Sequence, residues 1–179
     1  MSAFYFDIRK DTLYCDQINS KKRKSCVTIL NILLKSLLRW FAPILSFTTE
    51  EIYQLISKNS KSIHLEKFLI FPEKFKNERL AEKWSELMKI RDECNISIEE
   101  KRASKEIGSS LEAELNIRLN DKYKDVITNI DLSELCIVSK TEVYFDEVSD
   151  ILVETKKASG DKCPVCWKIS VEPCERHSQ

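Results

Sequence analysis

The chain has 179 residues, 42% hydrophobic and 32% charged, so it is long enough to bury a core of its own. Only two glycines and four prolines occur, which favours long helices over many turns. Basic and acidic residues balance at 29 each, but residues 1–49 hold eight of the basic and three of the acidic side chains. That positive end is the expected face for an anion. No run of eighteen apolar residues occurs, which argues against a membrane-spanning helix.

The first long helix is predicted from near Ser20 to Phe41, because apolar residues recur there at helical spacing. Its first turn, residues 21–24, holds four consecutive cations, and we call it the basic turn. Cations are unfavourable beside the positive end of a helix dipole, so a negatively charged partner would relieve that cost. A solvated turn without a partner is the alternative, and both interpretations stay open.

Pro43 is expected to end the first helix, and a capping box is expected to begin the second. In this box Thr48 is the N-cap residue and Glu51 is the third helical residue. Phe47 and Ile52 fit the hydrophobic staple that accompanies such a box. The corner is therefore predicted to be structural, with no chemistry of its own.

A third helix is predicted after Pro72, with an apolar stripe on one side and an end near Gly108. The period then changes to two over Leu111–Leu119, which is typical of a half-buried strand. A short amphipathic helix is expected over residues 122–130. Three further strands are predicted, at Leu135–Val138, Glu142–Phe145 and Ile151–Thr155.

Together these elements predict a mainly α fold: a helical-bundle domain, a small α/β domain and a C-terminal zinc knuckle. The predicted boundaries are 1–105 for the helical domain, 106–158 for the α/β domain and 159–179 for the zinc-binding module. Residues 156–161 are expected to form the linker before the module. No internal repeat and no low-complexity tract is apparent.

Four soft metal ligands lie within the last seventeen residues of the chain. A Cys-x2-Cys turn directs two thiolates at one point, and a Cys-x2-His turn can supply the other corners of a zinc tetrahedron. The predicted ligands of a structural Zn²⁺ are Cys163, Cys166, Cys174 and His177.

The competing interpretations of this segment are a disulfide pair, a thiol redox site and unrelated surface cysteines. Seven cysteines is an odd number and no apolar signal segment begins the chain, so a reduced, cytoplasmic protein is expected. A redox Cys-x2-Cys would stand between a strand and a helix, whereas this one lies in a polar stretch at the chain's end. Cys174 and His177 as nucleophile and base have no third group to orient them.

Four segments carry a family resemblance. In their order and spacing they resemble the carboxy-terminal region of isoleucyl-tRNA synthetases, a family of class I aminoacyl-tRNA synthetases. The resemblance covers essentially the whole chain. One of the segments, the corner, is shared with valyl, leucyl and methionyl relatives, whereas the first run combined with the Cys-Trp ending favours the isoleucyl family. The segments are Phe4–Asp16, the corner Ala42–Ile52, Ile107–Ala113 and the ending Lys162–Trp167.

The resemblance implies that the helical domain receives the anticodon stem and loop of isoleucine tRNA while the zinc module helps to hold the loop. Phosphates attract lysine and arginine, and unstacked bases stack on aromatic rings. For Trp167, packing over the thiolates is an equally open role. The candidate RNA-binding residues are Arg9, Lys10, Lys21, Lys22, Arg23, Lys24, Trp167, Lys168 and Arg176.

The signatures of aminoacylation in this family, His-Ile-Gly-His and Lys-Met-Ser-Lys-Ser, do not occur in the chain. The two histidines are His177 and His64, and a loop or packing role is expected for His64. We therefore expect no catalytic residue here, with ATP bound only by a missing amino-terminal catalytic part. The chain is expected to be a monomer.

One departure from the family pattern concerns the metal, because the family module usually closes with a second Cys-x2-Cys pair after a longer insertion. Here the connection is compact and His177 would close the site.

Besides the RNA-binding segment of a synthetase, two other hypotheses stay open. One is a free-standing zinc and RNA-binding module, for which a start at Met1 is the one hint. The other is a structural or protein-interaction segment, favoured if the basic turn proves buried or paired with acidic groups of the same chain.

Overall fold

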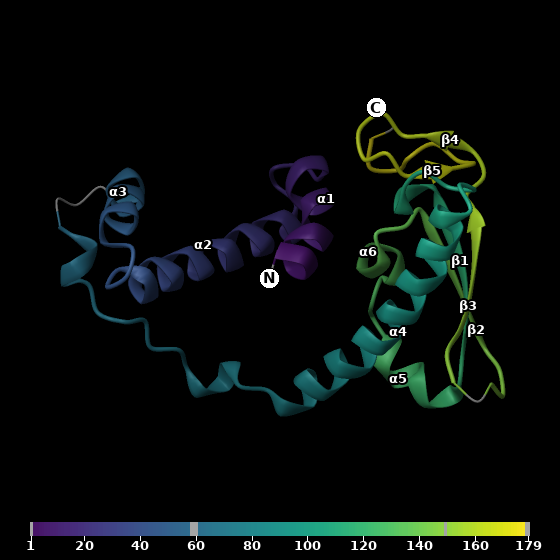
Figure 1. Cartoon of the computed structure of the whole chain (residues 1–179), viewed down its shortest axis with the longest axis horizontal. Helices are drawn as coiled ribbons and strands as arrows, with labels where there is room; N and C mark the ends of the chain where they lie inside the picture. The colour runs from purple at the N-terminus through teal and green to yellow at the C-terminus, as the bar shows by residue number, and fades with distance from the viewer. Residues whose placement is uncertain (1, 58–60, 149, 178–179) are drawn as a thin grey trace. The chain divides into compact units, whose positions relative to one another are not determined.

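The computed structural model describes residues 2–57, 61–148 and 150–177, so Met1 lies outside the described residues. The chain divides into two compact units. One comprises the residues up to Asp11 together with those from Asn77 onward, and the other is Thr12–Lys76. Helix α1 (Asp7–Cys15), preceded by the π-helical turn η1 (Ser2–Phe6), contributes residues to both units (Figure 1).

Helices make up the unit of residues 12–76. The predicted first helix is confirmed, because the helix begins directly after Ser20, whose side chain accepts a hydrogen bond from the Arg23 backbone N–H at 3.0 Å. The elements of this unit after α1 are α2 (Lys21–Phe41), α3 (Ser46–Ile56) and the 3-10 turns η2 (Ile63–Leu65) and η3 (Glu73–Phe75).

Two glutamates tie η2 to the long helices of this unit. The Glu66 carboxylate accepts hydrogen bonds from the Arg39 guanidinium (2.8 Å) and the Tyr53 hydroxyl (3.0 Å). Glu50 accepts from the backbone N–H of Ile63 at 2.9 Å. The apolar core of this unit is small. Its buried residues are Leu38, Ala42 and Ile63, and Leu34, Ile52 and Tyr53 pack against them.

The predicted capping box at the start of α3 is wrong. The helix begins at Ser46, and its N-cap position is Leu45, which provides no side-chain cap. Thr48 is therefore already inside the helix, while the Thr49 hydroxyl donates to the Leu45 carbonyl at 2.9 Å. Phe47 is 93% exposed, so it does not form the expected staple. The corner after α2 makes helix-like backbone bonds to the Phe41 carbonyl, and these start the next helix early.

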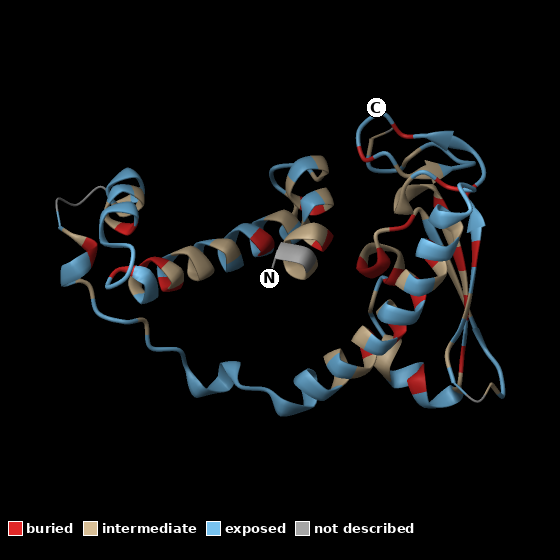
Figure 2. Ribbon diagram, in the orientation of Figure 1, coloured by how far each residue is buried: buried red, intermediate tan, exposed pale blue. Residues whose placement is uncertain are grey.

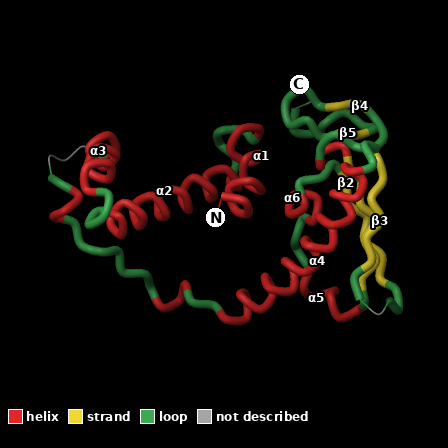
Figure 3. Tube along the Cα trace, viewed as in Figure 1, coloured by secondary structure: helices red, strands yellow, loops and turns green. Residues whose placement is uncertain are grey.

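A three-stranded sheet forms the centre of the other unit (Figure 3). The strand order is β2-β1-β3, with β1 parallel to β2 and antiparallel to β3. Alternate residues of β1 are fully buried, which confirms the predicted half-buried strand. The strands are β1 (Ala113–Leu119), β2 (Lys140–Phe145) and β3 (Leu152–Lys157).

The predicted third helix is α4 (Glu78–Ala103), and it packs against the sheet. One face of α4 is buried and shares a core with the inward face of β1 (Figure 2). The helix ends at a Ser104 cap, earlier than the expected end near Gly108, because Lys105 takes a positive φ of 61°. Phe4 and Ile8, from the start of the chain, pack into the same core. The buried residues of α4 are Leu87, Ile90, Cys94 and Ile98.

The strand predicted at Leu135–Val138 is wrong, because the chain forms the short helix α6 (Leu132–Cys136) there. Asp131 caps this helix by accepting from the backbone N–H of Ser133 and Glu134. The left-handed conformation of Ile137 then ends it. The helix expected over residues 122–130 is present in a shorter form, as η5 (Asp121–Tyr123) and α5 (Lys124–Ile127).

The fold class is confirmed at the level of a helical part and a small α/β part. The contacts assign α4 to the unit of the sheet, together with the start of the chain. The division at 1–105, 106–158 and 159–179 concerns which segments fold independently, and it stays a prediction.

Candidate metal centre and nucleic-acid interface

The terminal module, residues 159–177 of the described chain, is organised by a short antiparallel ribbon of β4 (Asp161–Lys162) and β5 (Ile169–Ser170). The backbone N–H of Cys163 donates to the Lys168 carbonyl at 2.9 Å, and that of Trp167 donates to the Cys163 carbonyl at 3.0 Å. Trp167 takes a positive φ of 63°. This tight turn directs the two thiols of the Cys-x2-Cys motif to the same side.

Gly160 enters the ribbon in a conformation that L side chains rarely adopt, with φ at 119°. A Cβ atom at this position would lie 2.2 Å from the backbone of Ser170. The ribbon therefore requires glycine here, for both its backbone conformation and the close approach of the opposite strand.

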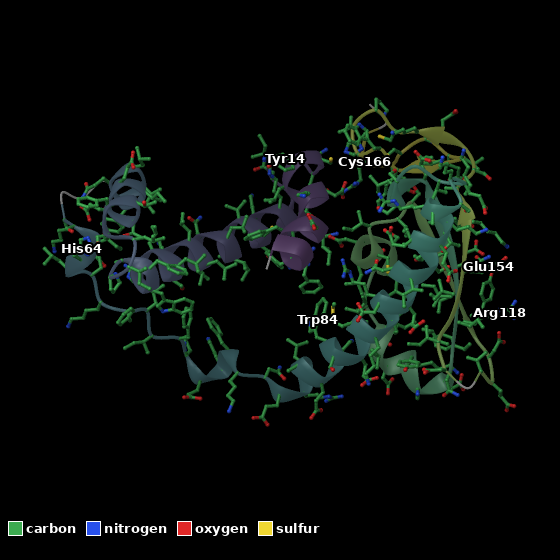
Figure 4. The ribbon with its side chains drawn as sticks, viewed as in Figure 1. Tyr14, His64, Trp84, Arg118, Glu154 and Cys166 are labelled. Carbon is green, nitrogen blue, oxygen red and sulfur yellow. The ribbon has the colours of Figure 1, made fainter. Side chains whose placement is uncertain are left out.

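The four predicted ligands converge at one point of the module (Figure 4, where Cys166 is labelled). Their ligand atoms all lie within 4.8 Å of one another. The His177 Nδ1 atom is 3.4 Å from the Cys163 sulfur and 3.2 Å from the Cys174 sulfur, and the sulfurs of Cys166 and Cys174 are 3.8 Å apart. The cluster can hold a metal ion.

These separations fit a tetrahedral ion bound by three sulfurs and one nitrogen. With metal–sulfur bonds of about 2.3 Å and a metal–nitrogen bond of about 2.0 Å, neighbouring ligand atoms stand about 3.5 to 3.8 Å apart. Three of the observed separations lie near these values, and all four ligand atoms lie within 4.8 Å of one another. Cys163 and Cys166 are buried, with 8% and 6% of their surface exposed, which keeps water from competing for this side of the site.

The two thiols of the first turn differ in acidity. Hydrogen bonds from the backbone N–H groups of Cys166 and Val165 lower the pKa of the Cys163 thiol to about 6. Burial raises the pKa of the Cys166 thiol to about 11. Cys163 is thus the more acidic of the two thiols, and a bound cation would favour the thiolate form of both.

The unit that contains the three-stranded sheet, residues 2–11 and 77–177 of the described chain, is called the α/β unit below. Within this unit, side-chain hydrogen bonds connect the module to the segments around α6 and β1. The Ser139 hydroxyl accepts from the Ile169 backbone N–H at 2.6 Å and donates to the Leu111 carbonyl at 2.5 Å. The Lys168 ammonium lies 3.5 Å from the Ser133 hydroxyl. Lys168 is half-buried, so its charge is directed partly toward the protein.

Arg176, between two of the ligands in sequence, is held by a carboxylate at the other end of the chain. Its Nη1 and Nη2 atoms donate to the two carboxylate oxygens of Asp11 at 2.8 and 2.9 Å. A further hydrogen bond from its side chain acts to lower the pKa of the Cys166 thiol, against the effect of burial. The predicted RNA contact of Arg176 would have to compete with these partners.

The basic turn is solvent-facing at three of its four positions. Lys21, Lys22 and Lys24 have exposed side chains. Arg23 is half-buried, and its guanidinium donates to the Asp16 carbonyl at 2.9 Å. A shallow hollow of about 600 Å³ adjoins the turn and is lined by Asn19, Lys21, Lys24, Ser25, Thr28 and Ile29.

Arg9 and Lys10 of α1 have partners within their own unit. The Arg9 guanidinium pairs with Glu134 at 2.8 Å and lies 6.0 Å from the ring centre of Tyr5. Lys10 is exposed and pairs with Asp7 at 2.6 Å, one helical turn away. Arg9 therefore has a clear structural role as well as its predicted RNA contact.

Trp167 is 60% exposed, so one part of its indole is available to a ligand. The Lys162 ammonium lies 5.3 Å from the ring centroid, at cation–π distance. Sequence reasoning missed Lys162, although a lysine directly before the first ligand is a usable signal. It also missed Asp11, for which no local signal exists because its partner is 165 residues away.

The structure thus brings together the module cations, the metal ligands and α1 in one group. The basic turn belongs to the other unit.

Comparison with known proteins places the chain in a family. Residues 1–117 match the family described as the anticodon-binding domain of tRNA ligase, and the chain belongs to this family.

The relatives of the chain include isoleucine–tRNA ligases. The chain is 61% identical to the isoleucine–tRNA ligase of Pelagibacter ubique over 178 residues, 99% of the chain and 20% of that ligase. It is 42% identical to the isoleucine–tRNA ligases of Bradyrhizobium diazoefficiens and Methylacidiphilum infernorum, over 95% and 96% of the chain and 18% of each ligase. The chain spans about a fifth of the length of these relatives.

Across the part of the chain that the structure describes, no helix is long and apolar enough to cross a membrane.

Proposed function

We propose that this chain binds the anticodon stem and loop of an isoleucine tRNA, as a segment of an isoleucine–tRNA ligase. The observation that carries the proposal is the match of residues 1–117 to the anticodon-binding family, together with similarity to isoleucine–tRNA ligases over almost the whole chain. The binding energy would come largely from phosphate contacts, which are sensitive to salt.

The basic turn is the proposed primary contact with the RNA backbone. Its exposed lysines Lys21, Lys22 and Lys24 stand on a helix whose start is fixed by the Ser20 cap, so their positions are preorganised. The adjoining hollow has both lysine and apolar lining, which suits a sugar or base beside a phosphate. The exposure of Lys21, Lys22 and Lys24 argues against a buried turn, which is one of the two conditions that would favour a purely structural segment.

We propose Zn²⁺ as the ion of the Cys163, Cys166, Cys174 and His177 cluster. Three thiols and one imidazole are a donor set typical of structural zinc, and the site has no open position for a reacting water. When bound, zinc would cross-link the two turns of the module and fix their loops. Trp167 and Lys162 would then present a rigid aromatic and cationic surface, suited to an unstacked base of the loop.

The ligase activity named in the relatives is proposed for a longer protein, of which this chain corresponds to about a fifth. Within that protein the chain supplies recognition, and ATP and isoleucine bind elsewhere. A monomeric, cytoplasmic state and the three-part division of the chain belong to the same proposal.

The test is a binding measurement with the zinc-loaded chain, isoleucine tRNA and the same tRNA carrying a different anticodon, across a salt series. Tighter binding to the isoleucine anticodon is expected. For each tenfold rise in salt concentration, log affinity should fall by about 0.7 per contacted phosphate of single-stranded RNA. Equal binding to both tRNAs would reduce the chain to an unselective basic scaffold. Absence of binding at low salt would overturn the proposal.

A further inference from the structure

One ion pair joins the two ends of the chain inside the α/β unit. Arg176 lies in the module, and Asp11 lies on α1. The two side chains form a bidentate pair at 2.8 and 2.9 Å, the geometry that fixes both distance and orientation. The pair is partly shielded, since the two side chains are 35% and 28% exposed.

Arg176 also reaches the metal site. It stands between Cys174 and His177 in sequence, and its side chain hydrogen-bonds the Cys166 sulfur. Groups that hydrogen-bond a metal ligand set its orientation, and their loss commonly weakens metal binding. One guanidinium therefore contacts a ligand sulfur on one side and the Asp11 carboxylate on the other.

Contacts hold the start of the chain at other points as well. Phe4 and Ile8 pack into the core of the α/β unit, and Arg9 pairs with Glu134. Toward the end of this segment, Asp11 makes a polar contact with the module. We expect Arg176, the partner of Asp11, to take the observed position when the turn from Cys174 to His177 is folded. A bound metal would hold this turn in its folded form.

We propose that Arg176 is a positioning residue that couples metal binding in the module to the docking of helix α1 on the α/β unit. This inference rests on the proposed metal site. With the ion bound, the turn is closed, the guanidinium is directed at Asp11, and α1 is held at the Asp11 turn. Without the ion, the turn opens and the pair with Asp11 is lost, while the apolar anchors and the Arg9 pair of α1 remain.

Thermodynamic linkage makes the coupling measurable from both ends. If metal binding stabilises the docked α1, then docked α1 must increase metal affinity by the same factor. If the Asp11–Arg176 pair forms equally well with and without the ion, metal binding does not change the docking of α1, and docked α1 does not change metal affinity.

The first experiment is amide hydrogen exchange of the full chain, with Zn²⁺ and with a chelator. Zinc is expected to slow exchange in residues 7–15 by about tenfold, the scale of an outer contact to a metal ligand. Residues 113–119 of β1 serve as the internal control, because their bonds lie inside the sheet. Equal exchange in residues 7–15 under both conditions would overturn the coupling.

The second experiment measures zinc affinity by competition with a chromophoric chelator. Asp11→Asn should weaken zinc binding by about tenfold, although Asp11 is not a ligand. Asp7→Asn is the matched control, because it removes the same charge from the same helix while its partner is Lys10. Zinc affinity unchanged by Asp11→Asn, or weakened equally by both substitutions, would contradict the proposal.

Different outcomes would overturn the metal site and its coupling to α1. A wild-type chain that takes up no zinc would overturn the metal site and the coupling with it. Zinc uptake with the same exchange in residues 7–15 would overturn the coupling alone and leave the metal site in place.

Discussion

The basic turn and the terminal module both place cations where the sequence predicts RNA contacts, yet their cations have different surroundings. In the basic turn, Lys21, Lys22 and Lys24 have exposed side chains. In the module, Arg176 is bound to Asp11, and Lys168 is half-buried beside Ser133. The residue types are the same, but the module cations are already engaged in holding the fold.

This difference shows that a cation's availability is decided by tertiary contacts. A paired arginine must lose a carboxylate before it gains a phosphate, so its net contribution to RNA binding is small. An exposed side chain such as that of Lys21 or Lys24 loses mainly water of hydration. We therefore expect the basic turn to dominate the salt dependence of RNA binding, and the module to contribute shape and an aromatic surface.

Removal of a metal ligand should have the largest effect. Structural zinc in finger peptides contributes about 10–16 kcal/mol, so Cys166→Ser is expected to abolish stable zinc binding and unfold the module. The α/β unit should keep its cooperative thermal transition, because its core lies in α4 and β1. Metal content and calorimetry provide the measurements, and Cys15→Ser is the control, since Cys15 is outside the cluster. Loss of the main transition would show that the module is part of one cooperative core.

Disturbing the ribbon should have the next largest effect. Gly160→Ala introduces a Cβ against the Ser170 backbone and a strained φ, which costs at least about 1–3 kcal/mol. Zinc affinity should fall accordingly. Gly108→Ala is the matched control, because its Cβ would meet only the Glu112 carboxylate at 3.4 Å. If both variants bind zinc like the wild type, the ribbon does not shape the site.

Trp167 separates an RNA role from a packing role. If a base stacks on its exposed indole, Trp167→Ala should weaken RNA binding by about 1–3 kcal/mol, while Trp167→Phe retains most of the affinity. Zinc affinity should not change. Reduced zinc affinity with normal RNA binding would instead assign Trp167 to packing over the thiolates.

Sequence periodicity predicted the elements whose signals are local. The Ser20 cap and the apolar spacing located α2, and strict alternation located β1. The spacing of Cys163, Cys166, Cys174 and His177 predicts a shared ligand cluster, and the structure brings these four residues together in a group that could hold a metal ion.

The elements that sequence misjudged depend on their surroundings. Thr48 and Glu51 match a capping box, but the backbone bonds after Phe41 start α3 three residues earlier. Leu135–Val138 is apolar enough for a strand, yet the Asp131 cap starts a helix that ends at Cys136, and α6 packs near α4. Contacts such as Arg176 with Asp11 span nearly the whole chain and leave no local pattern.

The most direct test of the account is the salt dependence of tRNA binding by two triple variants of the zinc-loaded chain. Lys21, Lys22 and Lys24 are replaced by alanine in one, and Lys122, Lys156 and Lys157, exposed lysines of the α/β unit, in the other. The net charge changes equally in both. The account predicts that the slope of log affinity against log salt falls by about 2 in the first variant, for three lost phosphate contacts, and stays at the wild-type value in the second. Equal slopes in the two variants would contradict it, because the basic turn would then act only through net charge.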